Sequence, residues 1–256
     1  MGEIPILELR KVTKRFGGIT AVDRVSLKVP ANGIIGLIGP NGSGKSVTFD
    51  CIMGLLQADA GDILLKGESI RALSADGIGR RGIGRTFQVC RVLHGMTVLE
   101  NLMVMTQARG LGENLALVFR RRLLGRSDAY ARRKALALLD DVGLRLWQDE
   151  LASNLSYGQQ KLLSFAAILA AEPAPELILL DEIAAGVNPT MVNSLVDYIR
   201  NYRARGRAFL IIEHDMKVIM NICDEVVVLD HGRLIAHGAP RHVQEDPRVI
   251  EAYFGR

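Results

Sequence analysis

A glycine-rich segment at residues 39–46 constrains this chain more than any other part of its sequence. It reads Gly-Pro-Asn-Gly-Ser-Gly-Lys-Ser and follows the short apolar run Ile34–Ile38. Such a run is typical of a buried parallel strand, and we expect a helix from Ser46 to about Leu56. The pattern G-x-x-x-x-G-K-[ST] between a strand and a helix is suited to binding phosphates. The sequence therefore predicts an α/β fold built around a phosphate-binding loop.

Each residue type in this loop has a chemical reason to be there. Glycines let backbone N–H groups approach phosphate oxygens without a clash from Cβ, and the following helix adds the positive end of its dipole. Lys45 is expected to reach the β- and γ-phosphates, and Ser46 is expected to ligate Mg²⁺. The predicted nucleotide-binding residues of this segment are Gly39, Pro40, Asn41, Gly42, Ser43, Gly44, Lys45, Ser46 and Val47.

A second apolar run, Leu177–Leu180, ends in the two carboxylates Asp181 and Glu182. Alone this pattern is common, but beside a phosphate loop it becomes informative. A carboxylate at the tip of such a strand can hold Mg²⁺ through water, which assigns that role to Asp181. Glu182 is then expected to polarise the water that attacks the γ-phosphate in line.

A third segment, Leu155–Lys161, contains another feature suited to phosphate. Ser156 and Gln159 have the spacing of a capping box, so an ordinary helix start is one interpretation. A serine hydroxyl, the N–H of Gly158 and a helix N-terminus also form an anion-binding end. One nucleotide cannot use both ends of the same chain if they lie on different subdomains. We therefore expect a second copy of the module to supply this end in trans.

Patterns typical of strands lie on both sides of the phosphate loop. Ile6–Val12 alternates in part between apolar and polar residues, and Val25–Val29 alternates cleanly. Two apolar runs, Phe209–Ile212 and Val226–Leu229, follow the run at Leu177–Leu180. We therefore expect a mostly parallel sheet with an antiparallel β region near the N-terminus.

The middle of the chain, residues 89–168, has a different character. Thr97–Glu100 fits a capping box, residues 128–142 show helical spacing, and no part of this stretch reads as a good strand. We expect one domain over residues 1–256 with a helical insertion. Its expected parts are a catalytic α/β core at 1–88 and 169–256 and a helical subdomain at 89–168.

The composition excludes several classes of protein. A hydrophobic fraction of 48% and a charged fraction of 23% are globular values, which exclude a disordered or fibrous chain. The longest apolar run, Phe165–Ala171, has seven residues, whereas a membrane-spanning helix needs about 20. Met1–Pro5 shows no secretory-signal pattern. Cys51, Cys90 and Cys223 are too scattered for a disulfide scaffold or a Cys-x-x-Cys metal site, and we expect them to be small buried hydrophobes.

The charge is weakly positive. The net charge of +4 comes from 32 basic and 28 acidic residues, which is compatible with nucleic acid or an acidic membrane face but requires neither. Arginines gather at Arg120–Arg122, and Arg132–Lys134 is nearby in sequence. We expect a solvated helical face there; the alternative is a contact with a membrane-associated partner or anionic headgroups.

In these motifs the chain resembles the ATP-binding subunits of ABC transporters, over essentially its whole length. Residues 39–46 resemble the Walker A motif of that family, and Ser156–Gln159 resembles its signature motif. Asp181 and Glu182 stand at the Walker B aspartate and the catalytic glutamate. The resemblance implies a P-loop NTPase (RecA-like) core that carries a helical insertion.

Three single residues extend the resemblance. Gln88 stands at the Q-loop glutamine, which implies roles in catalysis and at the metal, and His214 stands at the switch histidine. Phe16 stands at the aromatic residue that stacks on adenine. From the residues alone these assignments are weaker, because a lone Gln is usually on the surface, a lone His is usually structural, and a Phe in such a strand is often core.

The resemblance also implies ligands, partners and location. It implies ATP and Mg²⁺ as the ligands, with ATP hydrolysed to ADP and phosphate to drive transport. It implies a head-to-tail dimer with a second ABC ATPase subunit, which is either a paralogue or a second copy. Two transmembrane permease subunits and, indirectly, a periplasmic or extracellular solute-binding protein would complete the system. The chain would lie at the cytoplasmic face of the inner or plasma membrane, and no nucleic acid is expected.

Within the family, the chain is similar to the importers of branched-chain amino acids. The segments that carry this similarity are Arg85–Gln88, Met96–Leu102, Ser156–Gln160, Ala184–Pro189 and Ile250–Gly255. Importers of urea or amides share several of these features and remain an alternative. Two other classes are a soluble ABC ATPase acting on nucleic acid or ribosomes, and a small-molecule kinase, which would not explain the motif at Ser156.

The chain departs from the family's usual pattern after the two carboxylates. Ile183 follows Glu182 where the family usually has proline, and Val187 stands where leucine is usual. The segment Glu172–Pro175 is also slightly unusual. None of these departures removes a phosphate or metal ligand. Because proline would fix φ in the turn, Ile183 is expected to affect the turnover rate rather than the reaction.

Overall fold

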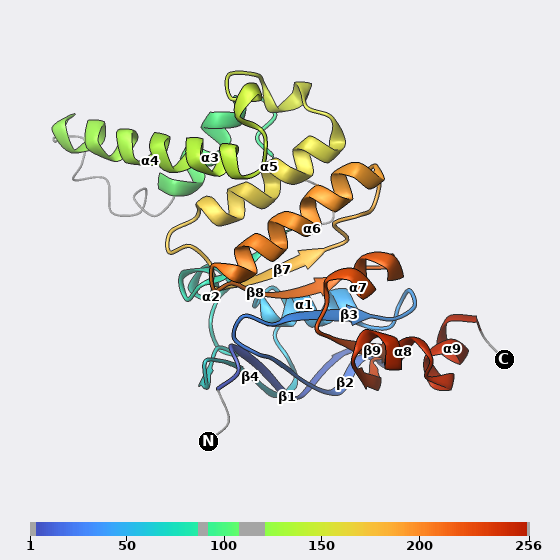
Figure 1. Cartoon of the computed structure of the whole chain (residues 1–256). Helices are drawn as coiled ribbons and strands as arrows, with labels where there is room; N and C mark the ends of the chain where they lie inside the picture. The colour runs from blue at the N-terminus through green and yellow to red at the C-terminus, as the bar shows by residue number, and fades with distance from the viewer. Residues whose placement is uncertain (1–3, 87–91, 108–120, 255–256) are drawn as a thin grey trace. The chain divides into compact units, whose positions relative to one another are not determined.

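The computed structural model describes residues 4–86, 92–107 and 121–254 (Figure 1). The chain forms two compact units, and each unit is made of separate segments of the sequence. The first unit comprises Met1–Arg85, Glu176–Ala184 and Ile199–Arg256, and the second comprises Thr86–Pro175 and Ala185–Tyr198. The second unit thus also includes residues 169–175 and 185–198, and the sequence-based division at 89–168 stays a prediction.

An antiparallel sheet of four strands occupies part of the first unit. The strand order is β2-β1-β4-β5, and every neighbouring pair is antiparallel. In β2 the side chains of Val25, Leu27 and Val29 are buried, whereas Ser26 and Lys28 are exposed, as the alternation predicts. The strands are β1 (Leu7–Phe16), β2 (Ile19–Val29), β4 (Ala60–Leu65) and β5 (Glu68–Ser69).

A second sheet in the same unit has six strands in the order β10-β9-β3-β8-β7-β6. All its neighbouring pairs are parallel except β9 and β10. This confirms the mostly parallel sheet. The strands are β3 (Ile34–Ile38), β6 (Ile83–Arg85), β7 (Leu177–Asp181), β8 (Ala208–Ile212), β9 (Glu225–Asp230) and β10 (Arg233–Gly238).

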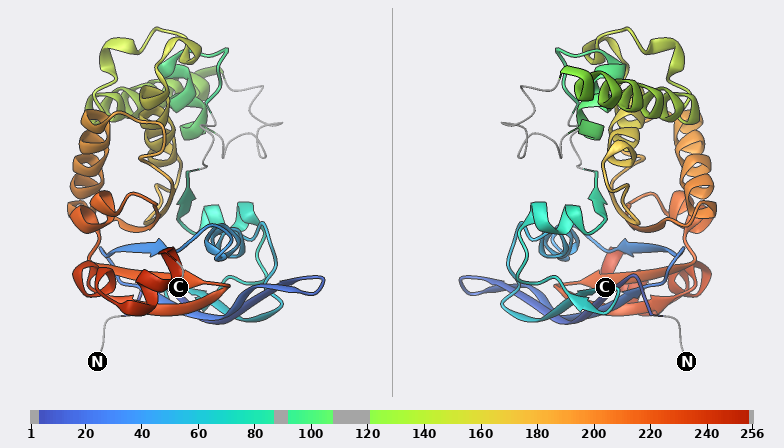
Figure 2. Two further views of the ribbon diagram at one scale, coloured as in Figure 1. Left: turned by 90° about the vertical axis from the view of Figure 1, so that its right-hand side faces the viewer. Right: turned by 90° about the vertical axis from the view of Figure 1, so that its left-hand side faces the viewer.

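Helix α1 (Lys45–Ile52) joins the two sheets into one hydrophobic core. Phe49 and Ile52 are fully buried and belong to the same cluster as Leu9 of the antiparallel sheet and Ile35 of the parallel one. Figures 1 and 2 show α1 beside both sheets. The helix ends at Ile52, four residues before the predicted end, and Gly54 follows in the left-handed conformation (φ 66°) that commonly terminates helices.

Four further short helices belong to the first unit, together with the last residues of α6 (Pro189–Ala204) from Ile199 on. They are α2 (Ala75–Arg80), α7 (Met216–Ile222), α8 (Pro240–Gln244) and α9 (Pro247–Phe254). The buried cysteines lie in this unit. Burial raises the pKa of the Cys51 thiol to about 11 and that of Cys223 to about 12. Both therefore behave as small hydrophobes, as predicted, while Cys90 lies outside the described residues.

The second unit is helical where the structure describes it. Helices α3, α4 and α5 pack against one another (Figure 1). Across 92–107 and 121–168, strand pairing is limited to one isolated bridge between Thr97 and Leu151. The elements are α3 (Val98–Gln107), α4 (Arg121–Asp141), the 3₁₀ turns η2 (Arg145–Trp147) and η3 (Ala152–Asn154), α5 (Tyr157–Ala170), and the part of α6 (Pro189–Ala204) up to Tyr198.

Helix α4 carries the predicted basic face. Arg132 and Arg133 are exposed, which confirms a solvated surface for these two residues, while Arg120 lies outside the described residues. Lys134 instead pairs with Glu172 at 2.9 Å, and Glu172 also accepts a hydrogen bond from the hydroxyl of Tyr130 at 2.8 Å. In residues 4–86, 92–107 and 121–254, no helix combines the length and the apolar character needed to span a bilayer.

The start of α3 is organised by two polar side chains. The hydroxyl of Thr97 accepts the N–H of Glu100, and the Glu100 carboxylate accepts the N–H of Thr97 at 2.8 Å, which confirms the predicted capping box. The buried side chain of Asn101 accepts the N–H of Leu93 at 2.7 Å and donates to the carbonyl oxygens of Leu93 and Thr97. Asn101 therefore holds the segment that precedes α3.

Replacing Asn101 by alanine should lower the melting temperature of the protein. The change removes several hydrogen bonds and takes away the acceptor of the Leu93 N–H, at a cost of about 1–3 kcal/mol. At about 2–4 °C per kcal/mol for a chain of this size, thermal denaturation followed by circular dichroism detects the loss. Asn154→Ala is the matched control, because Asn154 is exposed and its side chain donates to the exposed Glu150 at 3.2 Å. An equal shift in both variants would contradict the role of Asn101.

Candidate active site

The phosphate loop leaves β3 and enters α1 through two positions that only glycine can occupy. Gly39 adopts a φ of 147°, and an added Cβ would lie 2.0 Å from the carbonyl oxygen of Leu229. Gly44 adopts a φ of 101°, and an added Cβ would lie 2.3 Å from the carbonyl oxygen of Ala21. Neighbouring backbone thus approaches the loop too closely for any side chain at these two positions.

The lysine of the loop folds back over it. Lys45 is only 6% exposed, and its ammonium group donates to the carbonyl oxygens of Gly39 at 2.7 Å and Pro40 at 2.9 Å. Burial lowers the pKa of Lys45, and the negative charges of Glu182 and Asp181 oppose that shift. These carboxylates are therefore close enough to the ammonium group to act on it.

Several polar groups of the loop suit a phosphate ligand. The hydroxyl of Ser43 is buried and has no hydrogen-bond partner in the described part of the structure. Gly44, as the N-cap of α1, offers no side chain to the first N–H groups of the helix, which are the groups that bind anions. Asn41, Gly42 and Ser46 are exposed. The residues of the loop therefore fit a bound nucleotide.

The first predicted carboxylate, Asp181, ends β7 and is buried. It forms an ion pair of 3.0 Å with Arg85, whose guanidinium also pairs with Asp50 of α1. Burial raises the pKa of Asp181, and Arg85 opposes that shift. Sequence reasoning missed Arg85 as a partner, because nothing in its local pattern links the end of β6 to the end of β7.

The second carboxylate, Glu182, meets the predicted switch histidine. Its Oε1 lies 3.1 Å from Nε2 of His214. The register of the sheet explains this contact, because Asp181 of β7 pairs with Ile212 of β8. Glu182 also has a φ of 51°, a left-handed conformation unusual for a residue with a side chain. Such conformations are concentrated at functional sites.

The signature segment lies in the second unit. The Ser156 hydroxyl accepts the N–H of Gln159 at 3.3 Å, and the Gln159 side chain accepts the N–H of Ser156 at 2.9 Å. The capping box is therefore confirmed. Gly158 is closely packed. An added Cβ would lie 3.2 Å from the side chain of Met191 and 3.4 Å from that of Val187, so a larger residue would require these neighbours to shift.

A buried lysine that sequence reasoning missed supports this helix start. Lys161 is 8% exposed and donates to the carbonyl oxygen of Ala185 at 2.8 Å. Its ammonium group also lies 5.2 Å from the centre of the Tyr157 ring, a cation–π distance. Lys161 lies two residues after Gln159 in sequence, but its position alone gave no sign of burial.

Three predicted residues of the site remain: Phe16, Gln88 and Val47. Phe16 ends β1 with 45% of its surface exposed, which excludes the alternative that it belongs to the core, and Lys14 lies 5.4 Å from its ring centre. Gln88 lies outside the described residues. Val47 is half-buried in α1.

The C-terminal helix adds a feature at the phosphate loop. Burial raises the pKa of the Tyr253 phenol, and a hydrogen bond with the backbone of Gly39 opposes that shift. A cavity near this contact is lined by Pro40–Ser43 together with Arg248 and Glu251. Residues of α9 therefore line the same cavity as the phosphate loop, which the sequence motifs did not indicate.

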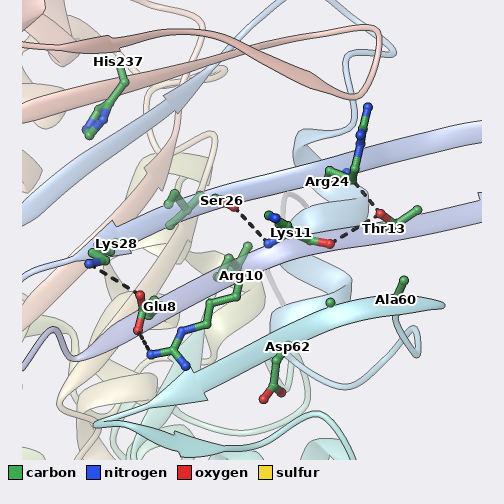
Figure 3. A pocket seen from close by; sticks show the side chains of 13 residues that line it. Glu8, Arg10, Lys11, Thr13, Arg24, Ser26, Lys28, Ala60, Asp62 and His237 are labelled. Carbon is green, nitrogen blue, oxygen red and sulfur yellow. Dashed lines mark hydrogen bonds and ion pairs between the residues drawn. The ribbon is translucent and has the colours of Figure 1, made fainter.

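Another hollow lies on the outer face of the antiparallel sheet (Figure 3). Its charged residues largely satisfy one another: Glu8 pairs with Arg10 at 2.7 Å and with Lys28 at 3.5 Å. The predicted site residues are absent from the lining that the structure describes for this hollow. It is therefore separate from the phosphate loop.

Comparison with known proteins identifies the family. The profile of the family described as ABC transporter matches residues 22–185. The chain belongs to the ABC transporter family. A further profile, described as branched-chain amino acid ATP-binding cassette transporter, matches residues 233–256.

Relatives and solved structures agree with this assignment. The chain is 41% identical to the high-affinity branched-chain amino acid transport ATP-binding protein BraF of Pseudomonas aeruginosa, across 98% of each chain. It is 36% identical to LivG of Escherichia coli, of the same description, again across 98% of each. A crystal structure of a nucleotide-free ATP-binding cassette from an ABC transporter has a TM-score of 0.85 at 33% identity and covers 98% of this chain and 100% of its own.

As an ABC cassette, this chain binds ATP and couples its hydrolysis to transport. The fold confirms the predicted P-loop architecture. Five of the predicted elements of the site belong to the first unit: Phe16, the phosphate loop, Asp181, Glu182 and His214.

Replacing Lys45 by alanine should weaken ATP binding by at least about tenfold, because a hydrogen bond to a charged group contributes about 1.5–3 kcal/mol. Equilibrium titration with ATP measures the affinity, and circular dichroism checks that the fold is retained. Lys66→Ala is the matched control, since Lys66 is half-exposed and pairs with Glu176 on the surface. Unchanged ATP affinity and unchanged hydrolysis in Lys45→Ala would refute the assignment.

Proposed function

We propose that this chain hydrolyses ATP to drive the import of branched-chain amino acids. The match of residues 233–256 to the branched-chain amino acid cassette profile carries the proposal. The 41% identity to BraF along nearly the whole chain supports it. Contacts with the solute would be made by permeases and a solute-binding protein. The support for this solute therefore comes from the similarity of the ATPase chain to one subgroup of the family.

The proposed chemistry divides between binding and catalysis. Lys45 and the loop N–H groups would hold the β- and γ-phosphates, and the exposed ring of Phe16 would stack on adenine. Ser46, Asp181 and Gln88 would hold Mg²⁺, which supplies charge neutralisation on the transferring phosphoryl group.

The catalytic step would depend on Glu182 and His214. The carboxylate of Glu182 would orient and polarise the attacking water. His214, at 3.1 Å from that carboxylate, would fix its direction. Gln88 is assigned to the same step by its position in the sequence motif. This division predicts that binding and hydrolysis respond to different substitutions.

The proposed assembly follows from the two phosphate-binding ends. The phosphate loop belongs to the first unit and Ser156–Gln159 to the second. We propose a head-to-tail dimer of ATPase subunits, in which each ATP is held by the loop of one subunit and the signature segment of the other. Two permeases would anchor the dimer at the cytoplasmic face of the membrane, and a solute-binding protein would deliver the solute.

Replacing Glu182 by glutamine should leave ATP affinity close to that of the wild type and reduce hydrolysis by about 10²–10⁴-fold, the usual contribution of a general base. In cells whose permeases and binding protein are intact, the same change should stop leucine uptake. Uptake of radiolabelled leucine and of urea is measured in parallel, with Glu176→Gln as the exposed control. Near-wild-type hydrolysis would refute the role of Glu182. Loss of urea uptake with leucine uptake unchanged would refute the solute.

The shared-site dimer predicts association that depends on the γ-phosphate. Glu182→Gln subunits, mixed with the partner ATPase where that is a paralogue, should associate in ATP and separate in ADP. Adding Ser156→Arg should abolish association, because a long side chain would occupy the phosphate-binding end. Ser26→Arg, at an exposed serine of the antiparallel sheet, should not. Sedimentation measures the mass. Association in both nucleotides, or association insensitive to Ser156→Arg, would contradict the shared site.

A further inference from the structure

Glu213 is a buried carboxylate that the proposed chemistry does not use. It follows β8 directly and is only 2% exposed. A carboxylate removed from water requires hydrogen-bond donors around it. Its partners therefore indicate what it does in the fold.

The two oxygens of Glu213 accept hydrogen bonds from two different turns. Oε1 accepts the backbone N–H of Ala184, in the turn after β7, at 2.6 Å. Oε2 accepts the N–H groups of His214 at 2.9 Å and Asp215 at 3.3 Å, in the turn after β8. One side chain thus ties together two turns that the sequence separates.

These two turns carry the residues proposed to act on the attacking water. Glu182 lies two residues before Ala184, and His214 follows Glu213 directly. Their 3.1 Å contact depends on both turns keeping their positions. The turn after β7 also has Ile183 directly after Glu182, so no proline ring restricts φ there. The bond from Ala184 to Glu213 restrains this turn from outside.

We propose that Glu213 is a positioning residue for ATP hydrolysis: it holds the Glu182 and His214 turns in register. The inference rests on the proposed roles of Glu182 and His214. Among the residues that the structure describes, Glu213 accepts bonds from these turns and not from the phosphate loop. Its loss should therefore affect the chemical step much more than the binding of ATP.

The test is Glu213→Gln, which keeps the shape of the side chain but replaces one acceptor oxygen with an NH₂ donor. Facing backbone N–H groups, that donor cannot form the bonds that the oxygen formed. We expect kcat to fall by about tenfold to a hundredfold, as misplacement of a reacting group does, with KM for ATP within about twofold of the wild type. Glu225→Gln, at an exposed residue that contacts His237, should change neither constant.

A double-mutant cycle distinguishes positioning from general destabilisation. If Glu213 acts through His214, adding Glu213→Gln to His214→Ala should lower single-turnover hydrolysis little further. Glu213→Asp serves if the glutamine variant folds poorly, because its shorter carboxylate cannot reach both turns. Its kcat should also fall. Melting temperatures confirm that each variant is folded.

Three outcomes would overturn the proposal: an unchanged kcat in folded Glu213→Gln or Glu213→Asp, a rise in KM that matches the loss in kcat/KM, or losses that are fully additive with His214→Ala. The proposed role of Glu182 fails separately, if Glu182→Gln itself retains hydrolysis. A loss of hydrolysis in Glu182→Gln alone, with Glu213 variants unaffected, would refute only the inference about Glu213.

Discussion

The parallel pairing of β3, β8 and β7 is the constraint on which the rest of the candidate site depends. Because the carboxyl ends of parallel strands meet at one edge of a sheet, the segments that follow Ile38, Asp181 and Ile212 emerge together. The phosphate loop, the carboxylate turn and the histidine turn are therefore neighbours, although long stretches of chain separate them. The contact between Glu182 and His214 is a direct consequence of this register.

Lys45, Asp181 and Glu213 are buried charged residues of the first unit, and each meets a group of suitable polarity. Lys45 donates to carbonyl oxygens of its own loop, Asp181 pairs with Arg85, and Glu213 accepts backbone N–H groups. Burial shifts the pKa of Lys45 down and that of Asp181 up, and neighbouring opposite charges counter both shifts. Buried charges are costly without such partners. The arrangement keeps polar groups fixed before a nucleotide arrives, which is how electrostatic preorganisation assists phosphoryl transfer.

Much of the site could be predicted because its residues are contiguous. The phosphate loop, the apolar strands and the two capping boxes are each defined within about ten residues, and the structure confirms them as local features. His214 and Phe16 were assigned only by resemblance to the family, since a single residue has no pattern of its own. The end of α1 was predicted too late, because Gly54 in the left-handed conformation stops the helix earlier than the apolar spacing indicates.

The sequence by itself determined where the backbone bends around phosphate, which strands are buried on both faces, and which chemistry the motifs can support. These properties depend on residue type and on short-range spacing, which the chain carries in one dimension. Only the tertiary structure decided that Arg85 pairs with Asp181, 96 residues away, and that Glu213 holds the N–H of Ala184, 29 residues away. Such contacts depend on strand order and register, which are set by how the whole core packs and not by any local pattern.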